Sequence, residues 1–382
     1  MNILITGGRA PVALELARAF HRAGHTVFMA ESLRGHLSQP SVAVKASFVV
    51  PAPRQETGAF LEALTRIVEQ NQIDLLIPTC EEVFHIAKGL DDLPCRVFTE
   101  PLDKLDSFHN KWKFALAASD CGLRVPNSIL IQNQSDLMQA FAHWRGLVLK
   151  PVYSRFASRT LILPQLRDVL STLTFDTPWV AQEFIAGQQF CTYSVCQNGR
   201  VTAHATYPTI FTAGQGATVA FQHVEHPAIF NWTQTFVERY NVTGQMSFDF
   251  IQSSDGEVYA LECNPRATSG VHLLASHPQF ADSFLRAERV EAQQHITPLE
   301  NNSQMLASAM LAYALPAALR KNELRSWAKT FFTSDDVIWD AKDPLPFLLQ
   351  FRSLLFYLRL ARQKGISPLE ASTFDIEWNG EV

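Results

Sequence analysis

The chain has 382 residues, of which 47% are hydrophobic and 18% are charged, and its formal net charge is −5. This length predicts two or three domains, because single hydrophobic cores stop growing at roughly 250–300 residues. The weakly acidic balance and the lack of a basic run interleaved with aromatic residues exclude nucleic acid as a partner attracted by bulk charge. No membrane span is expected either, because no apolar run reaches spanning length without charges.

The first hundred residues predict an α/β domain. A buried strand at 2–6 is followed by a turn, an amphipathic helix ending near Gly24 and a second strand at 26–30, which is a βαβ beginning. Further strands are expected at 48–50 and 74–78, with a helix at 60–70. The start, MNILITGG, lacks the basic region and cleavage site of a signal peptide. The six cysteines are scattered without a CxxC pair, which indicates reduced thiols in a cytoplasmic protein and no zinc site.

Two features of this domain have alternative interpretations. The turn GGRAP (7–11) lacks the GxGxxG fingerprint, so a tight strand-to-helix turn is favoured over an anion-binding helix N-terminus. Glu81 and Glu82 follow the strand 74–78 at the edge where α/β sheets bind ligands. They are expected either to hold a substrate ammonium group or to begin a solvated helix.

The middle of the chain predicts an antiparallel sheet and two functional lysines. A helix is expected at 102–118 and contains Lys111, which is either a phosphate ligand or a solvated surface lysine. The apolar strand 147–150 ends in Lys150, whose burial is costly unless its ammonium group meets an anion. More strands are expected at 179–185, 191–196 and 201–207.

The segment 245–271 predicts a hairpin with acidic residues inside its apolar strands. Period two places Glu262 and Asn264 on one face, and strand pairing brings Asp249 to that face. Two carboxylates and an amide oxygen suit Mg²⁺, and Arg266 follows as a cation for a phosphoryl or carboxylate oxygen. The alternative is a hairpin whose polar residues face water.

The order of these motifs resembles the ATP-grasp superfamily, in particular its carbamoyl-phosphate-synthase-like and biotin-carboxylase-like members. The resemblance covers about residues 1–290 and rests on LVLKP, QEFI and, most specifically, LECNPRATSG. It implies an α/β and α+β multidomain protein with an ATP-grasp fold. The expected parts are a Rossmann-like domain (1–101), an ATP-grasp domain (102–290, with a small subdomain at 115–185 and a large antiparallel part at 186–290) and a mostly helical carboxyl-terminal extension (291–382).

The same resemblance implies roles for individual residues. Lys111 and Lys150 would contact the ATP phosphates, and Arg266 would face the γ-phosphate or an acyl phosphate, so that Lys150 and Arg266 carry the catalysis. The Mg²⁺ ligands, with Mn²⁺ as an alternative ion, would be Asp249, Glu262 and Asn264. The adenosine of ATP would be bound by Gln182, Glu183, Phe184, Ile185 and Gln189.

Three segments depart from the family pattern. The loop 152–159 has no glycine, so Arg155 or Arg159 would replace the backbone contacts to phosphate, or the loop is a surface segment. Gln188 and Gln189 stand where an acid usually binds the ribose. The small-residue loop 208–218 either shapes an acceptor pocket or is a hairpin tip.

The expected activity is an ATP-dependent ligase that activates a carboxylate as an acyl phosphate and joins it to an amine. A phosphoryl transferase without an amine acceptor and a non-catalytic ATP-binding regulatory protein are the alternatives. Helices are expected at 304–319 and 347–362; Arg352 and Arg359 exclude a membrane span for the second. That helix is expected to pack on the body or in a homodimer interface, the alternative being a membrane surface or another partner.

Overall fold

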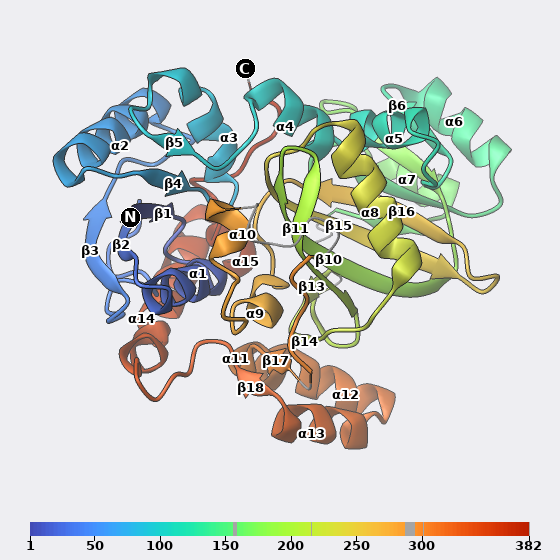
Figure 1. Ribbon diagram of the computed structural model, residues 1–382. Coiled ribbons are helices and arrows are strands. Elements are labelled where there is room, and N and C mark those ends of the chain that lie inside the picture. Colours follow the sequence, from blue (N-terminus) through green and yellow to red (C-terminus); the bar gives the residue numbers. More distant parts are fainter. Residues whose placement is uncertain (156–158, 215, 287–294, 301, 382) are drawn as a thin grey trace.

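The amino-terminal domain is a parallel sheet with helices on both faces. The computed structural model of the protein describes residues 1–155, 159–214, 216–286, 295–300 and 302–381 (Figure 1). Its first sheet has the order β3-β2-β1-β4-β5, and all four pairings are parallel. The elements are β1 (Asn2–Thr6), α1 (Pro11–Arg22), β2 (Thr26–Glu31), β3 (Val44–Val49), α2 (Thr57–Asn71), β4 (Leu75–Ile77), α3 (Glu82–Ala87), the 3-10 turn η1 (Leu90–Asp92) and β5 (Arg96–Val97).

Alternation along β1 explains the two helical layers. Ile3 and Ile5 belong to the core that also contains Phe20 of α1, whereas Leu4 packs in the core that contains Phe60 and Leu64 of α2. Successive side chains of a strand point to opposite faces, so one apolar run supplies both cores. The predicted βαβ domain is confirmed, and the parallel strands bring their carboxyl ends to one edge.

The middle of the chain forms two antiparallel sheets. The smaller has the order β6-β9-β7-β8 and the larger the order β11-β10-β15-β16. The first group contains α4 (Leu102–His109), α5 (Lys111–Asp120), β6 (Ser128–Ile131), α6 (Gln134–His143), β7 (Leu147–Pro151), β8 (Leu161–Ile162), α7 (Leu166–Thr172) and β9 (Trp179–Glu183). The second group contains β10 (Gly187–Gln197), β11 (Arg200–Pro208), α8 (Pro227–Arg239), β15 (Gly244–Ser253) and β16 (Val258–Asn264).

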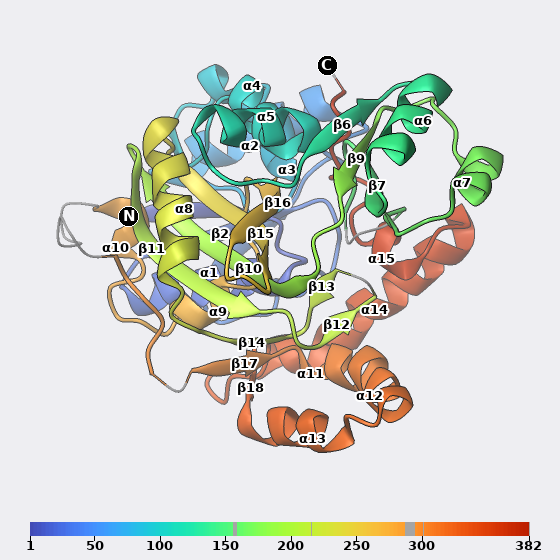
Figure 2. The same ribbon diagram turned by 90° about the vertical axis from the view of Figure 1, so that its right-hand side faces the viewer.

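An aromatic core fixes the larger sheet against its helices. Helix α8 lies over one face of this sheet (Figure 2), where Trp232 and Phe236 meet Phe248 at ring-centroid distances of 5.2 and 5.4 Å. Phe114 of α5 reaches the same core and lies 6.0 Å from Phe248. Because Phe248 precedes Asp249, the core on one face of β15 holds the acid on the other face in place.

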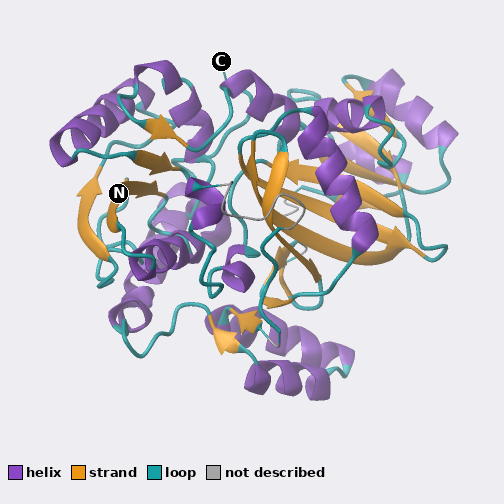
Figure 3. Ribbon diagram, in the orientation of Figure 1, coloured by secondary structure: helices purple, strands orange, loops and turns teal. Residues whose placement is uncertain are grey.

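The extension is mostly helical but also continues a sheet, as Figure 3 shows. Its strands pair in the order β14-β17-β18, so the predicted helix at 304–319 is wrong at its start, where residues 303–305 form a strand. The elements after β11 and β16 are β12 (Thr212–Ala213), β13 (Ala217–Thr218), β14 (Ala220–Gln222), α9 (Val271–Leu274), α10 (Asp282–Leu285), β17 (Ser303–Met305), α11 (Ala307–Ala309), the π-helical turn η3 (Met310–Ala314), α12 (Leu315–Lys321), α13 (Leu324–Thr333), β18 (Asp335–Asp336), α14 (Leu345–Lys364) and α15 (Pro368–Ala371).

The extension returns to the amino-terminal domain. Arg18 of α1 pairs with Asp343 at 3.0 Å, and both side chains are buried. The predicted helix at 347–362 is confirmed as α14, although Leu348 and Phe351 remain more than half exposed, so the body covers only part of it. Among the described residues, no helix has the length and hydropathy needed to cross a membrane. The domain boundaries at 101 and 290 stay predictions, and the second falls outside the described residues.

Candidate active site

The β15–β16 hairpin brings the predicted acids together. The strands pair antiparallel, with Asp249 opposite Glu262 and Ser247 opposite Asn264. A register shift between Asp249 and Phe250 marks a bulge at the acids, and bulges re-aim side chains next to sites. The carboxylate of Glu262 lies 3.3 Å from the ammonium group of Lys111, so this hairpin is more than a pair of strands facing water.

Lys111 reaches the acids because the predicted helix 102–118 is broken at Asn110. The Asn110 side chain accepts hydrogen bonds from the backbone N–H groups of Trp112 and Lys113, both at 3.1 Å, and so caps a second helix, α5. Lys111 is thereby the first residue of α5 and only 3% exposed. Its ammonium group also donates to the carbonyl of Ser154 at 3.1 Å. The interpretation as a solvated surface lysine is therefore wrong.

Lys150 is the second buried ammonium group at this site. It is the last residue but one of β7, is 7% exposed and donates to the carbonyl of Leu261 at 3.3 Å. Burial and the nearby charge of Lys111 together lower the pKa of Lys150 to about 8, while Glu262 and Asp249 act in the opposite direction. Two buried cations beside one another are costly, and a bound polyanion offsets that cost.

The two carboxylates have different protonation tendencies. Burial and the charge of Glu262 raise the pKa of Asp249 to about 7. Burial also acts to raise the pKa of Glu262, but Lys111 and Lys150 outweigh it and lower that pKa to about 2. The pKa of Asp249 thus stays raised although Lys150 acts to lower it, and a divalent cation in front of both carboxylates would favour its ionised form.

The side chains available to a metal at this site offer oxygen atoms only, which fits Mg²⁺. No group of three or more His, Cys, Asp and Glu side chains suited to a metal occurs among the described residues. Asn264 is the third predicted ligand, and its Oδ1 accepts from Arg266 Nη2 at 3.1 Å; its role as a metal ligand stays a prediction. One or two carboxylates are the usual protein share of a Mg²⁺ site at which substrate phosphates complete the shell.

Arg266 links the hairpin to the amino-terminal domain. Its Nη2 lies 3.6 Å from Glu81 Oε1, and its buried Nε has no hydrogen-bond partner among the described residues. Glu81 also binds the guanidinium of Arg155 and accepts from the backbone N–H of Trp378 at 3.0 Å. Glu81 and Glu82 are 3% and 2% exposed, so the predicted solvated helix start is wrong.

Glu82 is held inside its own domain. It accepts from the hydroxyl of Thr6 at 2.7 Å and from the backbone N–H groups of Thr79 and Cys80. No local sequence pattern indicates the partners of Glu81, because Arg155 and Trp378 are 74 and 297 residues away from it. The participation of Trp378 was therefore missed.

We expect the Glu81→Gln variant to lose about 3–5 kcal/mol of unfolding free energy at pH 7, because Arg155 and Arg266 then stay buried without their shared carboxylate. Burial opposes ionisation, yet Arg155, His109 and Arg266 lower the pKa of Glu81 to about 2. A lowered folded-state pKa stabilises the protein above pH 4.5, and this stabilisation is lost as the pH falls toward 2. Urea unfolding of the unaltered protein and the variant at pH 7, 5, 4 and 3 measures this effect. The difference between their unfolding free energies must shrink below pH 4.5, and a difference that stays constant with pH contradicts the prediction.

Comparison with known proteins identifies the domain around this hairpin. Residues 108–270 match the family described as the ATP-grasp domain. The chain contains an ATP-grasp domain. No curated protein matches the sequence.

Solved structures share the ATP-grasp fold over most of the chain. Biotin carboxylase from Campylobacter jejuni has a TM-score of 0.62 at 12% identity, covering 79% of this chain and 74% of that one. N5-carboxyaminoimidazole synthetase from Staphylococcus aureus, solved with ADP, has a TM-score of 0.61 at 12% identity, with 78% and 79% covered. L-amino acid ligase from Bacillus licheniformis has a TM-score of 0.57 at 17% identity, with 72% and 69% covered. At these identities the likeness establishes the fold.

Four of the residues predicted to bind adenosine lie where the smaller and the larger antiparallel sheet join, a connection called the hinge below. They are Gln182, Glu183, Phe184 and Ile185. Gln182 and Glu183 end β9 and pair with Val148 and Leu147 of β7, the strand that carries Lys150. The Gln182 side chain is buried, Glu183 accepts from the Asn127 amide at 2.8 Å, and Phe184 and Ile185 lead toward β10. The side chains of Gln188 and Gln189 at the start of β10 are exposed. The structure thus places the segment beside the lysine strand, and its role stays a prediction.

The structure describes parts of the two loops that the sequence singled out. Arg155 is buried in ion pairs with Glu81 and Glu377, and the guanidinium of Arg159 lies 5.1 Å over the Trp179 ring. Neither arginine is an unattached surface group. The rest of the predicted phosphate loop, 156–158, falls outside the described residues. The loop 208–218 contains the two-stranded ribbon β12–β13, and its position 215 is likewise not described.

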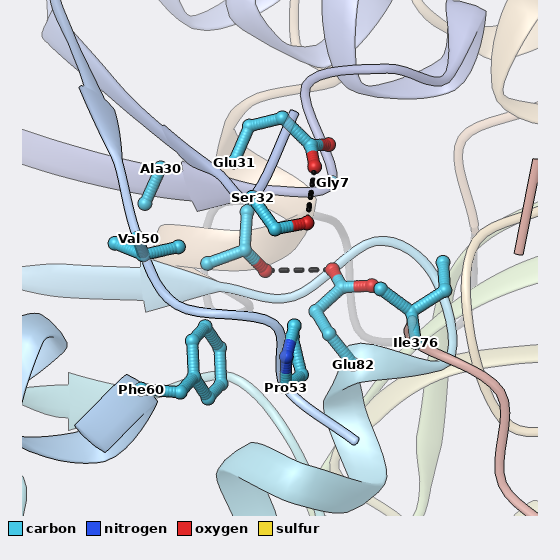
Figure 4. A pocket seen from close by; sticks show the side chains of 10 residues that line it. Gly7, Ala30, Glu31, Ser32, Val50, Pro53, Phe60, Glu82 and Ile376 are labelled. Atoms are coloured by element: carbon cyan, nitrogen blue, oxygen red, sulfur yellow. Dashed lines mark hydrogen bonds between the residues drawn. The ribbon is translucent and has the colours of Figure 1, made fainter. Parts of the chain in front are cut away.

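The GGRAP turn is a structural turn, as favoured. Gly7 has φ of +76°, and a Cβ there would lie 2.3 Å from the Thr79 hydroxyl. The guanidinium of Arg9 is buried against Glu31. Figure 4 shows the edge beyond the turn, where Ser32 donates to Glu31 beside a cavity of about 10 Å³. Thr6, which also lines this cavity, donates to Glu82. This volume holds one water molecule at most.

Proposed function

We propose that the protein is an ATP-dependent ligase that phosphorylates a carboxylate and joins it to an amine. The observation that carries the proposal is the convergence of Lys111 and Lys150 on the Asp249–Glu262 pair, with Arg266 two residues beyond Asn264. Phosphoryl transfer needs positioned cations rather than a protein nucleophile, and this arrangement supplies them.

Each charged residue has a proposed role. Lys111 and Lys150 bind phosphate oxygens of ATP, and Asp249, Glu262 and Asn264 hold Mg²⁺, which would neutralise charge on the transferred group. Mn²⁺ has the same preference for oxygen ligands and is expected to substitute. Arg266 stabilises the acyl phosphate, and its Nε, without a partner among the described residues, is free to donate to it.

The nucleoside part of ATP is proposed to lie along the hinge. Gln182, Glu183, Phe184 and Ile185 connect the two sheets that a nucleotide must lie between, and Gln189 offers an exposed amide to a ribose hydroxyl. The Staphylococcus aureus structure is a complex with ADP and the Campylobacter jejuni structure is a β,γ-ATP complex, and both support this nucleotide assignment.

The proposed reaction has two steps. An oxygen of the substrate carboxylate attacks the γ-phosphorus of ATP, the bond to the β,γ-bridging oxygen breaks, and ADP leaves. The amine nitrogen then attacks the acyl carbon, phosphate leaves with the former carboxylate oxygen, and the nitrogen loses a proton. An amide-like C–N bond results.

ADP release in Mg²⁺-ATP with pools of carboxylic acids and amines tests the proposal. Release that requires both an acid and an amine supports the ligase. ADP release with a carboxylic acid alone contradicts the amine step, and a phosphoryl transferase without an amine acceptor is then the remaining alternative. If the protein binds ATP but releases no ADP with any pool, the proposal that it is an enzyme is wrong, and a non-catalytic ATP-binding regulatory protein is the remaining alternative. Hydroxylamine, which converts an acyl phosphate to a hydroxamate, reports the intermediate directly.

Location and assembly follow from the proposed chemistry. A cytoplasmic ligase has ATP at hand, and all six cysteines are free thiols, which fits a reducing compartment. A homodimer stays a prediction, for which light scattering of the purified chain is the measurement. The proposed partners are small molecules, a carboxylate and an amine.

A further inference from the structure

The chain's last described residues cross the edge of the candidate active site. After α15 the segment 372–381 runs upward to the C-terminus between the amino-terminal domain and α4 (Figure 1). Trp378 is 2% exposed, stacks on Phe84 at 5.6 Å and donates from its indole to Asp106 at 3.0 Å. This anchor fixes the acids that precede it in the segment.

The first of these acids, Asp375, makes a two-pronged contact with Arg9. Arg9 Nη1 donates to Oδ1 at 2.6 Å, and Nη2 donates to Oδ2 at 2.8 Å. Ser32 donates to the same carboxylate, and Arg9 also donates to the carbonyl of Ser372. This pair of hydrogen bonds between Arg9 and Asp375 lies at the carboxyl end of the parallel strands, where α/β sheets bind ligands. This is the geometry with which arginine recognises a carboxylate ligand.

The second acid, Glu377, binds Arg155. Arg155 Nη1 donates to Glu377 Oε2 at 3.0 Å, and its Nη2 donates to the carbonyl of Trp378. Arg155 also binds Glu81, which lies 3.6 Å from the proposed acyl-phosphate residue Arg266. The segment therefore places one carboxylate on each of two buried arginines, of which Arg155 is linked through Glu81 to Arg266.

Polar groups without partners lie around the Trp378 anchor. Among the described residues, neither ring nitrogen of His109 has a hydrogen-bond partner, and the Nδ1 of His85 has none. The His85 ring lies 5.5 Å from Trp378, and His109 lies 4.8 Å from Phe84, on which Trp378 stacks. Buried polar atoms without partners cost stability and favour a ligand that satisfies them.

We propose that Arg9 and Arg155 form a binding site for a substrate that carries a carboxylate, and that Asp375 and Glu377 occupy this site until the substrate displaces the segment. This inference rests on the proposed ligase function. The side chains of Arg9 and Arg155 are 4% and 9% exposed. Glu31 and Glu81 each give one of these arginines a carboxylate outside the segment, so Asp375 and Glu377 are second anions that a substrate carboxylate can replace. Asp375 and Glu377 are 17% and 22% exposed and can be approached from solvent.

The test uses the full chain with the double substitution Asp375→Asn and Glu377→Gln, and Glu370→Gln as the matched control. Glu370 is exposed, and its carboxylate accepts only from Ser367 in the described structure. Because the double substitution weakens the binding of the segment to Arg9 and Arg155, we expect it to lower the KM of the carboxylate substrate about tenfold and to leave the KM of ATP unchanged. The control variant is expected to keep both KM values. An unchanged or raised carboxylate KM in a folded double variant overturns the proposal.

Carboxypeptidase digestion of the unaltered chain gives an independent result. We expect those of the twenty standard amino acids that support ADP release to speed the removal of residues 372–381 by the protease. The corresponding amino acid amides are expected to leave the segment protected. Equal protection with acids and amides overturns the proposal. If no acid of any pool supports ADP release, the ligase proposal itself fails, which is distinct from normal turnover with an unresponsive segment.

Discussion

Alanine at Lys150 is expected to lower the rate of ADP release by about 100- to 1,000-fold. The ammonium group is 7% exposed and approaches Glu262, so its loss removes a preorganised positive charge from the transferred phosphoryl group. Coupled detection of ADP under saturating acid and amine measures kcat. The unfolding midpoint in urea, measured in parallel, separates loss of charge from loss of fold.

Lys113→Ala is the matched control for Lys150→Ala. Lys113 lies two residues beyond Lys111 on α5, but its side chain is 53% exposed and pairs with Asp106 at 2.8 Å. We expect the control to keep ADP release within about twofold, since an exposed pair contributes at most about 1 kcal/mol. Comparable loss in both variants would mean that the catalytic charge is not localised at Lys150.

Glutamine at Glu262 is expected to lower ADP release by at least about 100-fold, with partial recovery at high Mg²⁺. The substitution removes the carboxylate that faces Asp249 and holds Lys111, so the proposed metal loses a charged ligand and one phosphate-binding lysine loses its anchor. A Mg²⁺ titration of ADP release measures the effect. A variant with unchanged kcat and unchanged Mg²⁺ requirement would place the metal elsewhere.

The control for this substitution is Glu257→Gln on the same hairpin. Glu257 pairs with Arg124 at 2.8 Å through side chains that are 43% and 58% exposed, far more than those at Glu262 and Lys111. The control variant should keep its Mg²⁺ dependence. Its unfolding free energy should change by less than about 1 kcal/mol.

Local periodicity accounts for the parts of the site that could be predicted. Alternation in β15 and β16 places Asp249, Glu262 and Asn264 on one face, because side chains repeat every two residues along a strand. The apolar strand ending at Lys150 signals a buried ammonium group in the same way. These inferences needed only neighbouring residues, and the observed register agrees with them.

The helix break at Asn110 was not predicted, although its signal is present. The run 102–118 reads as one amphipathic helix, and asparagine in its middle was not recognised as a helix cap. In the structure Asn110 is extended at φ −67° and ψ 113°, ends α4 and caps α5. That bend determines that Lys111 points to Glu262 rather than to solvent.

The sequence by itself determined the apolar strands and the hairpin face that carries the acids, because each depends on a repeat of two residues. Only the tertiary structure decided what surrounds them. The contact between Glu81 and Trp378 spans 297 residues, and that between Arg9 and Asp375 spans 366. Such contacts depend on how packed elements meet, which no local pattern encodes, and they bring the end of the chain to the reaction site.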